Sequence, residues 1–74
     1  MARGDNTIHA RLGQRIKTLR LRRGWKQIDL AVHCGFSRIY ISQIENGVKD
    51  IRISNLEVLA NAFGRSVAQL MTGL

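Results

Sequence analysis

Amide, guanidinium and hydroxyl side chains, all of which can hydrogen bond, gather in one short segment, FSRIYISQIENG, residues 36–47. On a helix, which turns about 100° per residue, one face carries Ile41 and the opposite face carries a mixed set of side chains. That set is Ile39, Ser42, Gln43 and Asn46, flanked by Arg38 and Tyr40. Gln can pair with adenine, Arg with guanine, and an aliphatic group can contact the thymine methyl. The segment is a candidate reader of base pairs; the alternative is an ordinary amphipathic helix on which Ile39 is incidentally exposed.

The sequence offers few residues in arrangements suited to catalysis or metal binding. The strong ligands for soft metals are His9, His33 and Cys34, which are too few and too badly spaced for a closed zinc site. No Ser-His-Asp set and no pair of carboxylates is evident, because the five acidic residues are scattered singly. We therefore expect no enzymatic activity, no metal or cofactor, and no small-molecule ligand.

The composition predicts an anionic partner. Twelve Lys and Arg face five Asp and Glu, giving a formal net charge of +7, which suits nucleic acid, an acidic protein or a membrane surface. A single cysteine cannot form an internal disulfide, and no run resembles a signal peptide or an apolar span of about 20 residues. We expect a cytoplasmic protein with no membrane partner, in which most basic side chains of the first helix are solvated.

Apolar spacings of three and four predict an all-α chain with five short helices and no strand. The predicted helices are residues 8–23, residues 26–33, residues 37–46, one beginning at Ser54 and one beginning at Ser66. The runs SNLE (54–57) and SVAQ (66–69) are capping boxes, and Gly24, Gly47 and Gly64 favour helix termination. Residues 1–7 are expected to form an N-terminal arm and residues 8–74 a compact domain.

Small and apolar residues between the second and third helices fall in an order that lets two helices cross. Ala31 is small enough for a close approach, and Gly35 can adopt a left-handed turn. The residues that can fill the space between are Leu30, Cys34, Phe36, Ile41 and Ile44. Taken together, this spacing is typical of a helix-turn-helix.

The sequence resembles the Cro and λ-repressor-like helix-turn-helix family, also called the xenobiotic-response-element family. The similarity covers nearly the whole chain, and its most specific runs are LGQRIKTLR, QIDLA, ISQIENG and NLEVLANAFG. The resemblance implies a five-helix domain whose second and third helices bind DNA. It places the third helix in the major groove of a palindromic operator.

The resemblance also implies roles for individual residues. The family's base-reading positions fall on Arg38, Ile39, Ser42 and Gln43. Gln27 matches a phosphate-anchoring glutamine, and Asn46 matches a contact to the DNA backbone. Arg20 and Glu45 match a structural ion pair, which suits Glu45 because a buried carboxylate without a partner is costly.

Four further residues are expected to contact the DNA backbone. Lys26 stands where the family usually has a capping Ser, Thr or Asn, so we expect a missing cap and a phosphate contact instead. Tyr40 flanks the outward face of the third helix. Lys49 and Arg52 lie in the loop that follows it, and for these two solvated loop charge is the alternative.

The last two helices carry more apolar residues than one small core needs. Leu56, Leu59, Ala60 and Phe63 are expected to face the core. If Leu70 also points inward, five apolar side chains remain for a two-fold interface with a second copy: Val58, Ala62, Val67, Met71 and Leu74. The alternative is that they wrap onto their own core.

These features predict a small homodimeric transcription regulator of double-stranded DNA without a separate effector domain. The sequence is similar to controller proteins of restriction-modification systems, which activate and repress; activation would add RNA polymerase as a partner. A phage Cro-like repressor is the close alternative. A protein-interaction module, such as an antitoxin whose basic surface neutralises an acidic toxin, is the alternative from another class. A membrane-surface peptide is disfavoured because the capping boxes and core pattern predict a packed globule.

Overall fold

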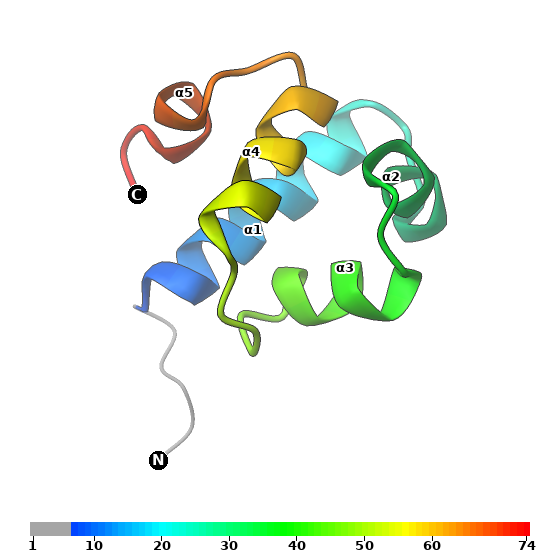
Figure 1. The fold of residues 1–74 in the computed structure, drawn as a ribbon, viewed down its shortest axis with the longest axis horizontal. Coiled ribbons are helices and arrows are strands. Elements are labelled where there is room, and N and C mark those ends of the chain that lie inside the picture. Colours follow the sequence, from blue (N-terminus) through cyan, green and yellow to red (C-terminus); the bar gives the residue numbers. More distant parts are fainter. Residues whose placement is uncertain (1–6) are drawn as a thin grey trace.

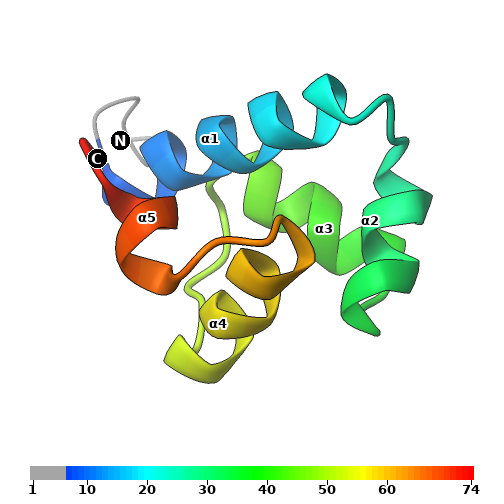
Figure 2. The same ribbon diagram turned by 90° about the horizontal axis from the view of Figure 1, so that it is seen from above.

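The computed structural model describes residues 7–74, and within that range the chain is all-α, as predicted. Its helices are α1 (Ile8–Arg22), α2 (Gln27–Cys34), α3 (Arg38–Glu45), α4 (Ile53–Ala62) and α5 (Val67–Met71). Helix α3 lies along the lower edge of the molecule in Figure 1, and α5 lies at the upper left. Seen from above, α1 and α4 occupy opposite edges (Figure 2). Apart from Thr7, which caps α1, the predicted N-terminal arm lies outside the described residues.

All five helices contribute to one apolar core. Its members are Leu12, Ile16, Leu19, Leu30, Ala31, Ile41, Ile44, Leu59, Ala60, Phe63 and Leu70. The apolar spacing of α1 therefore marks its inward face from Leu12 onward, whereas Ile8 at its start is 47% exposed. The inward face of α3 is buried as expected, and Leu70 points inward. In α4 and at its C-cap, Leu59, Ala60 and Phe63 face the core as predicted, whereas Leu56 is only partly buried. Within residues 7–74, no helix is long and apolar enough to cross a bilayer.

Side-chain caps fix the starts of α3 and α5, and the cap of α5 is the one predicted from the SVAQ run. The Ser37 hydroxyl oxygen accepts from the backbone N–H of Tyr40 at 3.0 Å. At α5, Ser66 accepts from the Gln69 N–H at 3.0 Å, and the Gln69 side-chain oxygen accepts from the Ser66 N–H at 2.8 Å. This reciprocal pair is a complete capping box.

The capping box predicted at residues 54–57 is wrong. Helix α4 begins at Ile53, with Arg52 at the N-cap and no side-chain cap hydrogen bond. The Leu56 N–H donates to the Arg52 carbonyl at 2.9 Å, so Ser54 already lies in the first turn. Ile51 packs against the core just before the helix, and this packing sets where the chain turns into α4. Tertiary packing here outweighs the local capping preference.

Helix α1 meets the end of α3 backbone to backbone. A Cβ added at Gly13 would overlap the Ile44 carbonyl oxygen and lie 2.7 Å from the Glu45 carbonyl oxygen. Gly47, which ends α3 with a φ of +71°, would place a Cβ 2.8 Å from the Cα of Ala10. The two glycines therefore allow an approach that no other residue type permits.

Arg15 in α1 and Arg23 at its C-terminal end have structural roles that we did not expect from the sequence. Arg15 donates from Nη1 to the Leu70 carbonyl and from Nη2 to the Thr72 carbonyl, both at 3.0 Å. Arg23 donates to the Phe63 carbonyl at 2.9 Å. These bonds satisfy carbonyls at the ends of α4 and α5, where the helices leave acceptors without partners. They attach the C-terminal helices to α1.

Candidate nucleic-acid interface

A tight turn sets α3 against α2. Gly35 adopts a φ of +71°, and the Phe36 N–H donates to the Ala31 carbonyl at 2.9 Å, which closes the end of α2. Ala31 is 1% exposed and lies in the shared core, where its small side chain permits the crossing. Gly35 and Ala31, which predicted a helix-turn-helix from the sequence, thus form the turn and the helix crossing of that motif.

Helix α3 has a packed face and an outward face. Ile41 and Ile44 are buried, whereas Ile39 is 62% exposed and Arg38 is exposed as well. Of the other predicted base-reading residues, Ser42 and Gln43 are partly buried, so less of each side chain is open than the helical projection indicated. Asn46 is exposed and donates to the Ser42 hydroxyl at 3.5 Å.

A buried ion pair joins α1 to α3. Arg20 Nε lies 2.7 Å from Glu45 Oε2, and Arg20 Nη2 donates to Glu45 Oε1 at 3.0 Å. The two side chains are only 8% and 3% exposed. Arg20 also donates from Nη1 to the Trp25 carbonyl at 2.8 Å. Both charges are therefore hydrogen bonded as well as paired, which desolvated charges require.

Gln27 lies between this ion pair and the outward face. Its Nε2 donates to Glu45 Oε1 at 3.2 Å, and its Oε1 accepts from Arg38 Nη1 at 3.3 Å. Both ends of the amide are thus engaged within the protein. The resemblance implied a phosphate contact for Gln27 but did not imply these two bonds.

Lys26 and Tyr40 also have local partners. Lys26 is the N-cap of α2 without a side-chain cap, and Asp29 compensates by accepting from the Lys26 N–H at 2.7 Å. The Tyr40 hydroxyl accepts from Asn55 Nδ2 at 3.1 Å, so it links α3 to α4 while its own hydrogen can still be donated. The Lys26 side chain is exposed and Tyr40 is partly buried.

The sequence profile of the helix-turn-helix family matches residues 16–70, which include α2, the turn and α3. This chain belongs to the Cro and λ-repressor-like helix-turn-helix family. A hypothetical transcription factor from Neisseria meningitidis serogroup B is 34% identical over 67 residues, covering 90% of this chain and 63% of the relative. The chain thus spans less than two thirds of that relative.

Solved structures of family members agree with this assignment. The crystal structure of a hypothetical Neisseria transcription factor, NHTF, superposes with a TM-score of 0.83 at 34% identity, covering 92% of this chain and 78% of that one. The restriction-modification controller protein C.AhdI from Aeromonas hydrophila gives a TM-score of 0.76 at 32% identity, covering 80% and 89%. Among relatives compared by sequence, the control protein C.BamHI from Bacillus amyloliquefaciens is 35% identical over 60 residues, covering 80% of this chain and 74% of the relative.

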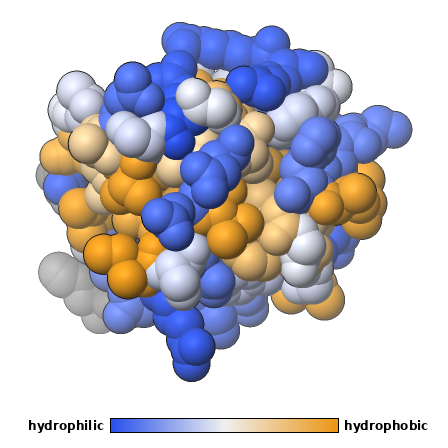
Figure 3. All heavy atoms as spheres, turned by 45° about the horizontal axis from the view of Figure 1, so that its top comes forward, coloured by the Kyte–Doolittle hydropathy of each residue, from blue (hydrophilic) through white to orange (hydrophobic). Residues whose placement is uncertain are grey.

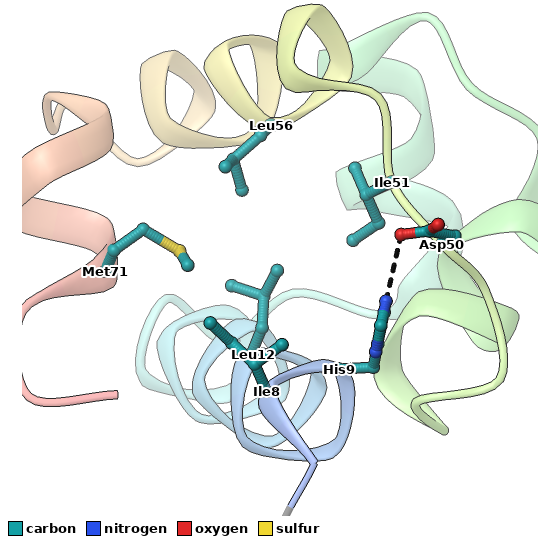
Figure 4. A pocket seen from close by; sticks show the side chains of 7 residues that line it. All are labelled: Ile8, His9, Leu12, Asp50, Ile51, Leu56 and Met71. Carbon is teal, nitrogen blue, oxygen red and sulfur yellow. Dashed lines mark hydrogen bonds and ion pairs between the residues drawn. The ribbon is translucent and has the colours of Figure 1, made fainter. Parts of the chain in front are cut away.

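In this helix-turn-helix protein, a side-chain hydrogen bond connects the loop after α3 to α1. His9 Nε2 lies 2.9 Å from Asp50 Oδ1, a contact between residues 41 positions apart that no sequence signal indicated. Beside this contact is a pocket of about 140 Å³. Its lining, drawn in Figure 4, is Ile8, His9, Leu12, Asp50, Ile51, Leu56 and Met71. Lys49 and Arg52, the predicted phosphate contacts of this loop, are exposed.

The residues predicted for dimerisation are divided between the core and the surface. Ala62, Val67, Met71 and Leu74 are partly buried and pack against their own core, and Val58 is partly buried too. Hydrophobic residues nevertheless form patches on the face shown in Figure 3, the side of the molecule on which α4 and α5 lie. Each of the five predicted interface residues is therefore partly accessible to solvent.

The remaining candidate ligands do not converge on a site. Among residues 7–74, no group of three or more His, Cys, Asp and Glu is placed to hold a metal ion. Cys34 is partly buried, and desolvation raises the pKa of its thiol to about 11. His33 stacks on Trp25 with ring centroids 4.3 Å apart, so one face of the Trp25 ring is covered.

Proposed function

We propose that this protein is a transcription regulator that binds double-stranded DNA sequence-specifically, as a homodimer on a palindromic operator. The observation that carries the proposal is the outward face of α3, where Arg38 and Ile39 are exposed beside Ser42 and Gln43 on a firmly packed helix. The similarity to C.BamHI and C.AhdI supports the finer assignment, a controller protein of a restriction-modification system.

Helix α3 would enter the major groove, which is wide enough to admit an α-helix. Arg38 would donate to guanine, Gln43 would pair with adenine, and Ile39 would contact a thymine methyl. Lys26, Lys49 and Arg52 would bind phosphates, and the net charge of +7 would favour encounter with DNA of any sequence.

A homodimer formed through α4 and α5 would present two copies of α3 about one DNA turn, or about 34 Å, apart. A palindromic operator has this symmetry. Because dimerisation obeys mass action, occupancy of the operator would rise steeply with protein concentration. A controller protein that activates would also contact RNA polymerase.

Selection from random duplexes tests the proposal. Wild-type protein is incubated with a randomised duplex library, and bound DNA is recovered from gel shifts over several rounds. We expect enrichment of a palindrome. Arg38→Ala should lose the preference at one base pair of each half-site, whereas Arg22→Ala, which removes an exposed arginine at the end of α1, should retain it. Binding without any sequence enrichment would contradict the proposal and favour the protein-interaction module.

A further inference from the structure

Four side chains form a continuous hydrogen-bonded relay from the core to the outward face of α3. The relay runs from Arg20 through Glu45 and Gln27 to Arg38, and its links are 2.7, 3.2 and 3.3 Å long. Its inner half is buried, and its outer end, Arg38, is exposed. A scaffold ion pair is thus connected to a residue to which we assign base reading.

The chemistry of Glu45 dictates which way the Gln27 amide faces. An ionised carboxylate can only accept hydrogen bonds, so the amide nitrogen of Gln27 must point toward it. The amide oxygen then points away, toward Arg38, which can only donate. The reversed amide would place two oxygens together at Glu45 and two donors together at Arg38. The buried carboxylate therefore selects one of the two amide orientations.

The Gln27 amide can orient Arg38 without neutralising it. An arginine has five N–H donors, and the bond to Gln27 occupies Nη1, which leaves donors for a base or a phosphate. A carboxylate at the same position would form an ion pair with the guanidinium and compete with guanine for it. A neutral acceptor restricts the direction of Arg38 and preserves its charge.

We infer that Glu45, acting through Gln27, is a positioning residue that sets the direction of the Arg38 guanidinium and thereby its base preference. The inference rests on the proposed base-reading role of Arg38. It makes the specificity of the outward face depend on side chains that touch no DNA base. Removing the link should change which base pair is preferred at one position, and should leave the other positions as they were.

A double-mutant cycle on the selected operator tests this inference. The proteins are wild type, Gln27→Met, Arg38→Ala and the double variant, and the probes are the operator and duplexes with each base pair replaced symmetrically. Gln27→Met should reduce discrimination about tenfold at the base pair that Arg38→Ala identifies, within the range that one bidentate base contact supplies. In the Arg38→Ala background it should cause no further loss there. Gln14→Met, at an exposed glutamine of α1, is the matched control.

The carboxylate is tested separately by Glu45→Gln, after circular dichroism shows that the variant folds. Its amide has a single acceptor oxygen, so it cannot accept from Arg20 Nε, Arg20 Nη2 and Gln27 Nε2 together as the carboxylate does, and the Gln27 amide is no longer held in one orientation toward Arg38. Discrimination should fall at the same base pair as in Gln27→Met. If the loss of the ion pair unfolds Glu45→Gln, the Gln27→Met cycle decides alone, with Gln27→Leu as its second variant.

The outcomes separate the inference from the proposed function. If Arg38→Ala alters one base pair while Gln27→Met leaves it unchanged, or if the two effects add, the relay does not position Arg38 and base reading stands. If Arg38→Ala weakens binding equally to every duplex, Arg38 reads no base and the inference fails with that role. If wild-type protein enriches no sequence, the proposed function is wrong and the inference falls with it.

Discussion

At the residue scale, Gln43 offers α3 an amide that can serve as both donor and acceptor for adenine. We expect Gln43→Ala to lose about 1–3 kcal/mol of binding free energy on the selected operator and to change binding to random duplexes much less. Gel-shift titrations on both kinds of duplex measure this difference. Gln14→Ala serves as the control because Gln14 is exposed on α1. Equal weakening on both duplexes would show that Gln43 contacts the DNA backbone instead.

Cys34 should react slowly in the native protein. Desolvation raises the pKa of its thiol from 9.0 to about 11, so the thiolate fraction at pH 8 is about 100-fold lower than in the unfolded chain. The folded state holds the thiol proton more tightly than the unfolded chain does. The contribution of this proton to the free energy of unfolding is therefore fully present below pH 9 and is lost as the pH rises toward 11. Alkylation by iodoacetamide at pH 8 should be more than about tenfold slower without urea than with it. Similar rates in both conditions would contradict the burial of the thiol.

Some residue roles could be predicted from the sequence, and others could not because they depend on the tertiary structure. Helical geometry places Glu45 on the same face of α3 as Ile41, and a buried carboxylate needs a cation; the resemblance to the family identified that cation as Arg20. The contact between His9 and Asp50 was not predictable, because it depends on how the loop after α3 returns to α1. The bonds of Gln27 to both Glu45 and Arg38 likewise depend on the exact crossing of α2 and α3.

At the scale of elements, the contact between α1 and α3 depends on the absence of a side chain at Gly13. We expect Gly13→Ala to lower the free energy of unfolding by about 1–3 kcal/mol, because the added Cβ overlaps carbonyl oxygens of α3 that cannot move independently. A decrease in the free energy of unfolding would be informative, because replacing glycine by alanine within a helix otherwise increases it by about 1 kcal/mol. Urea denaturation followed by circular dichroism measures the change.

Gly24→Ala is the matched control for that prediction. Gly24 adopts a φ of +71°, and nothing lies within 4 Å of a Cβ added there. Its substitution should therefore cost only the left-handed backbone conformation, about 1 kcal/mol. An unchanged or increased stability of Gly13→Ala would show that α1 and α3 can separate slightly without loss.

The loop between α3 and α4 should contribute to the salt dependence of DNA binding. If Lys49 contacts a phosphate, Lys49→Ala should reduce the slope of log affinity against log salt concentration by about 0.9. Lys17→Ala removes an exposed lysine of α1 and should leave the slope unchanged. Titrations at several salt concentrations compare the three proteins. A wild-type slope for Lys49→Ala would mean that Lys49 is solvated loop charge.

The positions of the helices were predictable because apolar spacing, capping serines and terminating glycines agree along most of the chain. The start of α4 was not, because Ser54 and Glu57 have the residue types of a capping box while the packing of Ile51 determines where the helix begins. The hydrogen bonds of Arg15 and Arg23 to α5 and to the end of α4 have no local sequence signal, because their acceptors are backbone carbonyls far along the chain.

At the scale of the whole molecule, the proposed homodimer predicts that charge on α5 separates the subunits. Val67→Asp and Met71→Asp should sediment as monomers at micromolar concentration, because each places a carboxylate in the proposed apolar interface. Both side chains also pack against their own core, so circular dichroism must show native helicity for each variant. Operator binding by the folded monomers should be weak.

Val32→Asp is the control for dimerisation. Val32 is a valine of α2 with 74% of its surface exposed, so the same added charge should leave the dimer intact. Folded Val67→Asp and Met71→Asp proteins that remain dimeric would show that the subunits associate elsewhere. The apolar patches over α4 and α5 would then need another explanation.

The backbone contact that Gly13 and Gly47 permit between α1 and α3 has a calorimetric consequence. The helix assigned to the major groove is already fixed to the body of the domain, so docking on DNA would not have to order it. The heat-capacity change of association would then reflect the apolar area covered between protein and DNA. It would lack the larger negative contribution that accompanies a segment folding on its target.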